Sequence, residues 1–236
     1  MCGRYSLATP NPAEVRGSFP IGDEVEIERR FNIAPGDDVL AVTSDHVGAP
    51  RGDRLRWGLV PFWARTPETG LKMINARVET AAAKPAFRSS LERFRCLIVA
   101  DGFYEWRATG TGPKQAYHIT RSSGGVFAFA GLWSRWRAPA ADRGGAPALR
   151  TCAILTTAAN SAVAPLHDRM PVILPAGAEL DWLDPSTPVT VLADLLAGLS
   201  AAETALRPVG PAVNDARYDG PECLAPPAET GQGRLF

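Results

Sequence analysis

A cysteine stands at position 2, in the opening stretch MCGRYSL. If Met1 is removed, Cys2 carries an α-amine and a thiol on adjacent carbons. In model compounds the pKa values of these groups are near ~8 and ~8.5, so both have nucleophilic fractions at neutral pH. The pair can capture an aldehyde as an imine that closes to a thiazolidine ring, or it can attack an acyl group with its own amine as base. An incidental cysteine explains this residue alone equally well.

Three further polar side chains could move protons or orient a substrate. Glu105 lies among aromatic residues in GFYEW, where loss of hydration raises the pKa of a carboxyl group toward the range useful for acid or base catalysis. A glutamate with its head in water is the alternative. His167, in HDRMP, has a side chain suited to proton transfer at neutral pH. Asn75 lies on the polar face of KMINARVET if that stretch alternates as a strand.

Three of these four stretches also contain an arginine. Arg4, Arg77 and Arg169 stand two positions after Cys2, Asn75 and His167. In extended chain this spacing puts both members of each pair on one side. Because guanidinium groups bind phosphate oxygens in bidentate fashion, such a surface suits a phosphate-bearing substrate. For any single arginine, an ordinary surface ion pair is the alternative.

Aromatic side chains could provide stacking platforms for unpaired bases. The candidates are Phe62, Trp63 and Trp106, and stacking of this kind contributes about 1 to 3 kcal/mol per base. Burial in the core is the alternative for each. Phe62 and Trp63 follow Pro61 at a strand end and are the better candidates for exposure.

Length and composition limit the classes of protein to which this chain can belong. At 236 residues with 45% hydrophobic residues, the chain is long enough for one sizeable core. The net charge is zero, so no global field draws it toward nucleic acid or membrane, and binding of this kind needs a local patch. No secretory signal or bilayer-length apolar run is present, which predicts a cytoplasmic protein without a membrane partner. The four cysteines form no Cys-x-x-Cys pair, which argues against a zinc site and a disulfide framework.

Short apolar runs separated by Gly and Pro predict the elements that position these residues. They indicate a single α+β domain with a mainly antiparallel β core and peripheral helices. A loop is expected over 134–149, a disordered tail over 225–236, and a monomer in solution. Strands are expected at 37–44, 55–63, 72–80, 95–106, 115–121, 126–133, 151–157 and 170–175, and helices at 11–19, 79–94, 177–184 and 189–199.

Several stretches together resemble the SOS-response-associated peptidase (SRAP) family, whose members cross-link to abasic sites in single-stranded DNA. They run from residue 1 to about 215, so the expected domain covers 1–224. The matching stretches are MCGRYSL, RRFNIAPGDDVLAV, WGLVPFWA, INARVET, RCLIVADGFYEW, FAFAGLW, AILTTAAN and HDRMPVIL.

The resemblance implies a mechanism. Met1 is removed autocatalytically or by an aminopeptidase, and Cys2 captures the ring-opened sugar aldehyde as a thiazolidine, with weak strand-cleaving lyase chemistry through the imine. Glu105 would shuttle protons, His167 would assist opening of the deoxyribose, and Asn75 would orient the amine or the sugar.

The resemblance also implies binding residues and partners. Arg4 and Arg77 would hold flanking phosphates, while Phe62, Trp63, Trp106 and Thr156 match positions near the DNA groove of the family. Arg169 is a further candidate for binding DNA, because it stands two positions after His167. Single-stranded DNA containing abasic sites is the implied partner, replication-fork proteins are further candidates, and no metal or organic cofactor is implied.

Two other functions remain open on the sequence. N-terminal nucleophile amidohydrolases and glutamine amidotransferases also commonly begin Met-Cys-Gly. A noncovalent module that binds single-stranded or modified DNA would use the arginines and aromatics but not Cys2.

Overall fold

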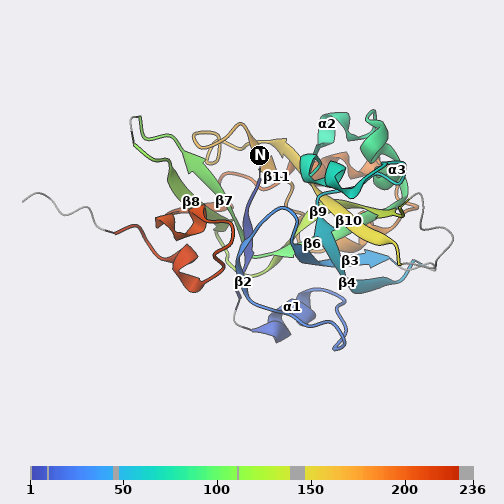
Figure 1. The fold of residues 1–236 in the computed structure, drawn as a ribbon, viewed down its shortest axis with the longest axis horizontal. Coiled ribbons are helices and arrows are strands. Elements are labelled where there is room, and N and C mark those ends of the chain that lie inside the picture. Colours follow the sequence, from blue (N-terminus) through green and yellow to red (C-terminus); the bar gives the residue numbers. More distant parts are fainter. Residues whose placement is uncertain (1, 10, 45–47, 111, 139–146, 229–236) are drawn as a thin grey trace, which may run out of the picture.

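The computed structural model describes residues 2–9, 11–44, 48–110, 112–138 and 147–228. Within these ranges the chain forms two sheets with helices at the periphery (Figure 1). The expected α+β domain with a mainly antiparallel core is confirmed. No helix in the described ranges is both long enough and apolar enough to cross a bilayer.

The first sheet is antiparallel throughout, in the order β12-β8-β7-β1-β2. Because β1 pairs with β7, the stretch that follows Cys2 is fixed beside the strand that contains Glu105. The strands of this sheet are β1 (Tyr5–Leu7), β2 (Arg30–Ile33), β7 (Gly102–Arg107), β8 (Gln115–Arg121) and β12 (Thr204–Val209).

The second sheet closes into a small barrel, because β10 pairs antiparallel with β9 and parallel with β4 at the two ends of the series β10-β4-β3-β6-β9. Two short strands extend β10 at its far end: β5 in parallel and β11 in antiparallel orientation. The strands are β3 (Asp38–Ser44), β4 (Pro50–Trp57), β5 (Asn75–Arg77), β6 (Arg95–Ala100), β9 (Phe127–Trp136), β10 (Leu149–Ala158) and β11 (Arg169–Pro171).

Four of the expected strands are shorter or divided. The strand expected over 55–63 ends at Trp57, because Gly58 adopts a φ of 130° and a Cβ there would lie 2.9 Å from the Gly70 carbonyl oxygen. The strand expected over 72–80 is extended only at Asn75–Arg77 before it turns into a helix. These two corrections change which side chains reach the surface.

Two corrections remain. The strand expected over 170–175 ends at Pro171, and beyond it only an isolated bridge pairs Ile173 with Phe129. The strand expected over 95–106 divides at Asp101 between the two sheets. The Asp101 carboxylate accepts hydrogen bonds of 2.6 Å from the Ser6 hydroxyl and from the Ala8 backbone N–H. This half-buried carboxylate therefore fixes the crossover by binding β1 and the residue that follows it.

The helices are short and follow local sequence signals. Asn11 caps α1 (Pro12–Ser18) by accepting a hydrogen bond from the Ala13 N–H. The helix expected over 79–94 is divided before Pro85 into α2 (Val78–Ala81) and α3 (Pro85–Arg93), since the residue before a proline is disfavoured in helical conformation. The remaining helices are α4 (Glu179–Leu183) and the 3₁₀ turns η1 (Pro67–Lys72), η3 (Val191–Ala197), η4 (Pro211–Asn214) and η5 (Pro221–Leu224).

Buried aromatic rings join the two sheets. Tyr5 of β1 packs edge-on against Trp57 and Phe129, with ring centroids 5.3 and 5.5 Å apart. All three rings are inaccessible to solvent, and edge-to-face packing adds about 0.5 to 1.5 kcal/mol per pair beyond burial. The N-terminal strand is therefore anchored three residues after Cys2.

The two segments predicted to lie outside the core fall partly beyond the described structure. The loop expected over 134–149 does connect two strands, but it is shorter, because β9 runs on to Trp136 and β10 begins at Leu149. Residues 139–146 of this connection lie outside the described residues. The tail predicted from 225 still contacts the domain at Ala225, whose carbonyl oxygen accepts a 2.8 Å hydrogen bond from the Gly210 N–H. Residues 229–236 lie outside the described residues.

Candidate active site around Cys2

Cys2 is completely buried just before the N-terminal segment enters β1. Its thiol lies 3.8 Å from the Arg4 carbonyl oxygen. Burial raises the pKa of Cys2 far above its ordinary value, and the negative charge of Glu105 raises it further. The expectation of an appreciable thiolate fraction is therefore wrong for the chain in this state. Met1, whose removal the sequence predicts, lies outside the described residues.

Asn75 contacts the cysteine directly. Its side-chain amide donates a hydrogen bond of 2.8 Å to the Cys2 carbonyl oxygen. The parallel pairing of β5 with β10 holds Asn75 opposite Ile154 and so fixes the amide in place. The Asn75 Oδ1 atom is buried and accepts no hydrogen bond from the described residues. A buried acceptor of this kind is available to a donor on a substrate.

Glu105 lies in the middle of β7 and is only 5% exposed. A backbone hydrogen bond from Tyr104 N–H to the Arg4 carbonyl oxygen, 3.0 Å long, ties this strand to the N-terminal segment. Desolvation raises the pKa of Glu105, and the positive charge of His167 offsets part of this effect. The desolvated glutamate expected from GFYEW is thus present, and the solvated alternative does not apply.

His167 approaches Glu105 from a turn rather than from an extended segment, since β11 begins only at Arg169. Its Nδ1 atom accepts a hydrogen bond of 2.9 Å from the Arg169 backbone N–H and lies 2.8 Å from an Asp168 carboxylate oxygen. The hydrogen bond from the Arg169 N–H requires an Nδ1 atom without a proton, whereas a hydrogen bond to the Asp168 carboxylate requires a protonated Nδ1. The imidazole therefore has a local partner in either protonation state, as a proton-transfer group requires.

The three arginines expected at the site have different environments. Arg4 is half-buried, and its guanidinium donates hydrogen bonds of 2.9 Å to the Asn32 side chain and to the Val213 carbonyl oxygen. Arg169 is buried and makes a bidentate ion pair with Glu79. Only Arg77 is exposed, at the end of β5. The predicted phosphate role of all three stays a prediction, with Arg77 the most accessible.

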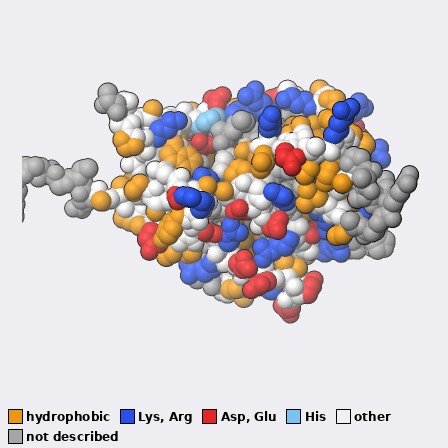
Figure 2. Space-filling view, viewed as in Figure 1, with side chains coloured by type: hydrophobic (Ala, Val, Ile, Leu, Met, Phe, Trp, Pro, Cys, Tyr) orange, Lys and Arg blue, Asp and Glu red, His pale blue; other side chains and the backbone are white. Residues whose placement is uncertain are grey.

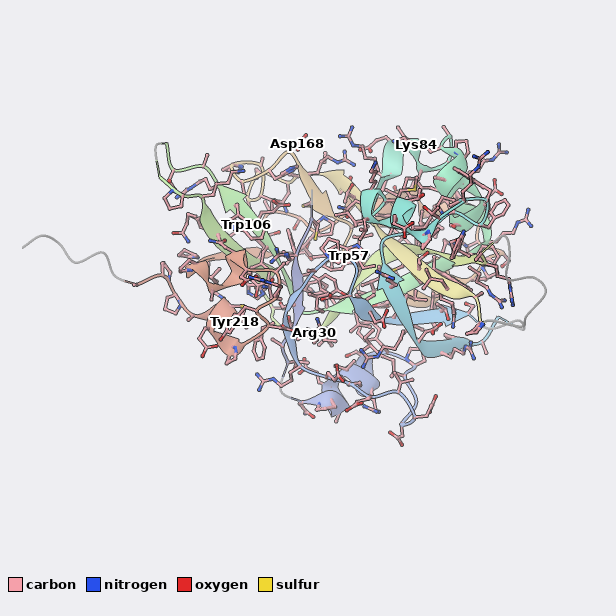
Figure 3. All side chains as sticks on the ribbon, in the orientation of Figure 1. Arg30, Trp57, Lys84, Trp106, Asp168 and Tyr218 are labelled. Atoms are coloured by element: carbon pink, nitrogen blue, oxygen red, sulfur yellow. The ribbon has the colours of Figure 1, made fainter. Side chains whose placement is uncertain are left out.

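The aromatic candidates also divide by exposure. Phe62 and Trp63 are 66% and 53% exposed in the turn after Gly58, as expected. Trp106 is partly buried, and its indole N–H donates to Asn214 Oδ1 over 2.7 Å. Figure 3 shows Trp106 and Asp168 in the part of the molecule that contains the N-terminus in Figure 1. Thr156 is buried on β10, with its hydroxyl bonded to no described residue.

Two residues that support the site, Asn32 and Glu79, were not predicted as site residues from the sequence. The Asn32 side chain accepts a hydrogen bond from Arg4. Its amide nitrogen donates to the carbonyl oxygens of Asp215 and Tyr218, so Asn32 connects Arg4 to the C-terminal segment. Glu79 forms an ion pair with Arg169. Neither role has a signal in local sequence, because the partners are far apart along the chain.

The surface charge is uneven although the net charge is zero. Lys and Arg side chains gather over the region of α2 and α3 on the face shown in Figure 2. A local basic surface of this kind can attract a polyanion where the whole molecule does not. Among the described residues, no group of three or more His, Cys, Asp or Glu side chains is arranged to hold a metal ion.

A small barrel and a second sheet that together surround a cysteine near the N-terminus with Asn75, Glu105 and His167 define a protein with a candidate N-terminal nucleophile site. Comparison with known proteins identifies the particular family. The chain belongs to the SOS response associated peptidase (SRAP) family, whose model matches residues 1–216.

Relatives of known name span bacteria and vertebrates. The chain is 39% identical over 228 residues to the abasic site processing protein YoqW of Bacillus subtilis, covering 95% of this chain and 99% of that protein. It is 32% identical over 216 residues to the mouse abasic site processing protein HMCES, covering 79% of this chain and 58% of that one. It is 28% identical over 240 residues to the abasic site processing protein YedK of Escherichia coli, covering 96% and 100%.

Solved structures agree with the fold. A protein from Bacteroides thetaiotaomicron superposes with a TM-score of 0.80 at 24% identity, covering 95% of this chain and 99% of that one. A phage-related protein from Bordetella bronchiseptica has a TM-score of 0.69 at 32% identity, covering 88% of this chain and 94% of that one. The two-sheet architecture is therefore a property of the group.

Proposed function

We propose that this chain processes abasic sites in single-stranded DNA by capturing them covalently through Cys2 once Met1 has been removed. The observation that carries the proposal is the hydrogen bond from Asn75 to buried Cys2. Glu105 interacts electrostatically with the Cys2 thiol, and His167 interacts in the same way with Glu105. Relatives named as abasic site processing proteins support the choice of lesion.

The proposed capture is a condensation that releases one water molecule. The α-amine of Cys2 attacks the aldehyde carbon of the ring-opened sugar, and loss of water from the carbinolamine gives an imine. The sulfur then adds to the imine carbon while the thiol proton is transferred to the nitrogen, which closes the thiazolidine. Strand cleavage by elimination from the imine is a competing minor route.

The electrostatics of the site favour attack by the amine before attack by the sulfur. Burial and Glu105 both disfavour the Cys2 thiolate, so the thiol stays protonated until the imine has formed. Glu105 has a raised pKa, which suits it to give a proton to the leaving hydroxyl and later to take one from the thiol. His167 assists ring opening of the deoxyribose, and Asn75 holds the Cys2 backbone while its free Oδ1 orients the sugar or the amine.

The proposal is tested with an abasic single-stranded oligonucleotide and a denaturing gel. Wild-type protein gives a cross-linked species without added reductant, and Cys2→Ala does not. Cys2→Ser is the matched control, because it keeps an N-terminal amine but cannot form the thiazolidine; it should be trapped only when borohydride reduces the imine. A stable species from Cys2→Ala without reductant contradicts the mechanism.

Measurement of the intact mass tests whether Met1 has been removed, which the proposed capture requires. Loss of Met1 from soluble wild-type protein is expected, and retention of Met1 excludes every mechanism that uses the amine of Cys2. Glu105→Gln distinguishes the two routes of removal, since an autocatalytic route should slow when the carboxyl group is replaced and an aminopeptidase should not. Release of ammonia from glutamine would instead support the amidohydrolase alternative.

A further inference from the structure

A second concave site lies at the opposite end of the barrel from Cys2. It is a cavity of about 510 Å³, and five arginines from five different elements line it. β10 begins at this end of the molecule and runs toward the N-terminus (Figure 1). The seven residues from Arg150 to Thr156 on this strand, which are six steps of about 3.3 Å, span about 20 Å. The five residues, called here the distal arginine pocket, are Arg51, Arg93, Arg95, Arg135 and Arg150.

Two of these arginines are held by the protein itself. Arg95 donates to the carbonyl oxygens of Trp182 and Leu91, over 2.6 and 3.0 Å, and is buried. Arg150 pairs with Asp53 and lies over the Trp133 ring. These contacts hold the two guanidinium groups in place, and they neutralise only part of the positive charge of the pocket.

The other three, Arg51, Arg93 and Arg135, are exposed and take part in none of the ion pairs found among the described residues. Arg135 stands directly opposite Arg150 in the register of β9 and β10. Like charges in directly opposed positions of a sheet are destabilising. Burial lowers the pKa of Arg150; the charge of Asp53 opposes this effect, and the charges of Arg51 and Arg135 add to it. The pocket therefore holds surplus positive charge that a bound anion would relieve.

Aromatic surface adjoins this charge. A smaller cavity of about 180 Å³ is lined by Phe62 and Trp63 and shares Phe94 and Arg135 with the distal arginine pocket. Phe94 is also exposed. A basic groove with aromatic side chains along it is the arrangement by which proteins bind single strands without reading their sequence.

We infer that the distal arginine pocket binds backbone phosphates of the same DNA single strand, where the strand continues past Phe62 and Trp63 away from Cys2. The inference rests on the proposed function for the identity of the strand. Exposed guanidinium groups bind phosphate oxygens in bidentate fashion. The pocket lies at the start of β10, at Arg150, whereas Asn75, which binds Cys2, pairs with Ile154 further along the strand. The affinity of the protein should therefore depend on strand length.

The test compares oligonucleotides of about 4 and about 16 nucleotides, a range that brackets typical single-strand site sizes. Binding is measured by fluorescence anisotropy across a salt series. The triple variant Arg51→Ala, Arg93→Ala, Arg135→Ala should lose the tighter binding of the long strand. Its slope of log K against log salt should be smaller by about 2, because each of three phosphates contributes about 0.7 on single strands. Binding and cross-linking of the short abasic strand should not change.

The control is the triple variant Lys114→Ala, Arg121→Ala, Arg217→Ala, which removes the same charge near β8 and the C-terminal segment. It should keep the preference for the long strand. Arg95 and Arg150 are left intact because they make structural contacts. If the pocket triple variant fails to fold, Arg93→Glu alone, at an exposed position ending α3, should weaken long-strand binding selectively.

Two results overturn the inference. One is a pocket triple variant that keeps the full length preference. The other is a wild-type protein that binds inorganic pyrophosphate in the pocket but shows no length preference, which would make the pocket a site for small anions. A wild-type protein that shows the length preference but forms no cross-link would refute the proposed function and leave the pocket as a strand-binding site.

Discussion

The side-chain amide of Asn75 donates a 2.8 Å hydrogen bond to the carbonyl oxygen of Cys2, joining residues 73 positions apart. This bond fixes the backbone of the reactive residue from a different sheet. Asn75→Asp cannot donate it but keeps the size of the side chain. We expect the cross-linking rate at saturating abasic strand to fall about three- to tenfold, the worth of one neutral hydrogen bond. An unchanged rate would show that the cysteine is positioned by other contacts.

Glu105→Gln should slow cross-linking and stabilise the fold at neutral pH. A carboxyl group whose pKa is raised by burial is harder to ionise in the folded protein, so it costs stability once the pH exceeds its unfolded pKa of about 4.3. The variant removes that cost. Its unfolding midpoint in urea should exceed that of wild type at pH 7, and the two should converge near pH 4.

The same variant should change the pH profile of the reaction. In wild type the cross-linking rate should fall as the pH rises through the raised pKa of Glu105, because the protonated carboxyl group that gives a proton to the leaving hydroxyl is lost. Glu105→Gln should lack this limb of the profile. A variant that loses binding and cross-linking in equal measure would assign Glu105 a structural role instead.

Arg77 and Arg169 should respond differently to alanine substitution. Arg77 is exposed, so Arg77→Ala should reduce the salt slope of strand binding by about one counterion and leave stability unchanged. Arg169 would have to give up its bidentate pair with Glu79 to hold a phosphate. Arg169→Ala should therefore lower the thermal midpoint and alter the slope less. An equal change of slope in both variants would show that Arg169 exchanges Glu79 for DNA.

Phe62 and Trp63 should matter for binding but not for folding, because both are more than half exposed. The double variant Phe62→Ala, Trp63→Ala should weaken strand binding by about 1 to 3 kcal/mol for each base that stacks, which is at least fivefold. The control Leu180→Ala, Val191→Ala removes two comparably exposed apolar side chains elsewhere and should leave binding intact. Equal loss in both double variants would argue against stacking.

His118 should limit stability in acid. Burial and the nearby charge of Arg207 together lower the pKa of His118 to about 3. The unfolded chain takes up a proton on this residue below about pH 6.5 while the folded chain does not, so stability falls as the pH drops from about 6.5 toward 3. Between pH 6.5 and 4.5 the wild type should lose about 2 kcal/mol more unfolding free energy in urea than His118→Gln does. Parallel losses would show that other groups dominate.

Much of the fold could be predicted because its signals are local. Alternating apolar runs located most of the strands, and Asn11 with Pro12 marked the start of α1. The errors occur where a distant contact overrides the local pattern. Gly58 ends a strand because the Gly70 backbone packs against it, and the 95–106 run divides at Asp101 because that carboxylate binds β1.

The features of the candidate site also fall into those that local sequence predicts and those that depend on distant contacts. The sequence alone determined the chemical groups: a cysteine that can become N-terminal, a glutamate among aromatics, and a histidine and an asparagine in polar stretches. It also indicated that Phe62 and Trp63 would be exposed, since a proline at a strand end directs the chain outward.

Only the tertiary structure decided which of these groups are free to act. It buries the Cys2 thiol and so raises its pKa, it pairs Arg169 with Glu79 and Arg4 with Asn32, and it leaves Arg77 exposed. It also gathers arginines from five elements into the distal arginine pocket, although no stretch of sequence is notably basic there. The physical reason is that charge state and availability depend on desolvation and on partners far away along the chain, which local sequence does not encode.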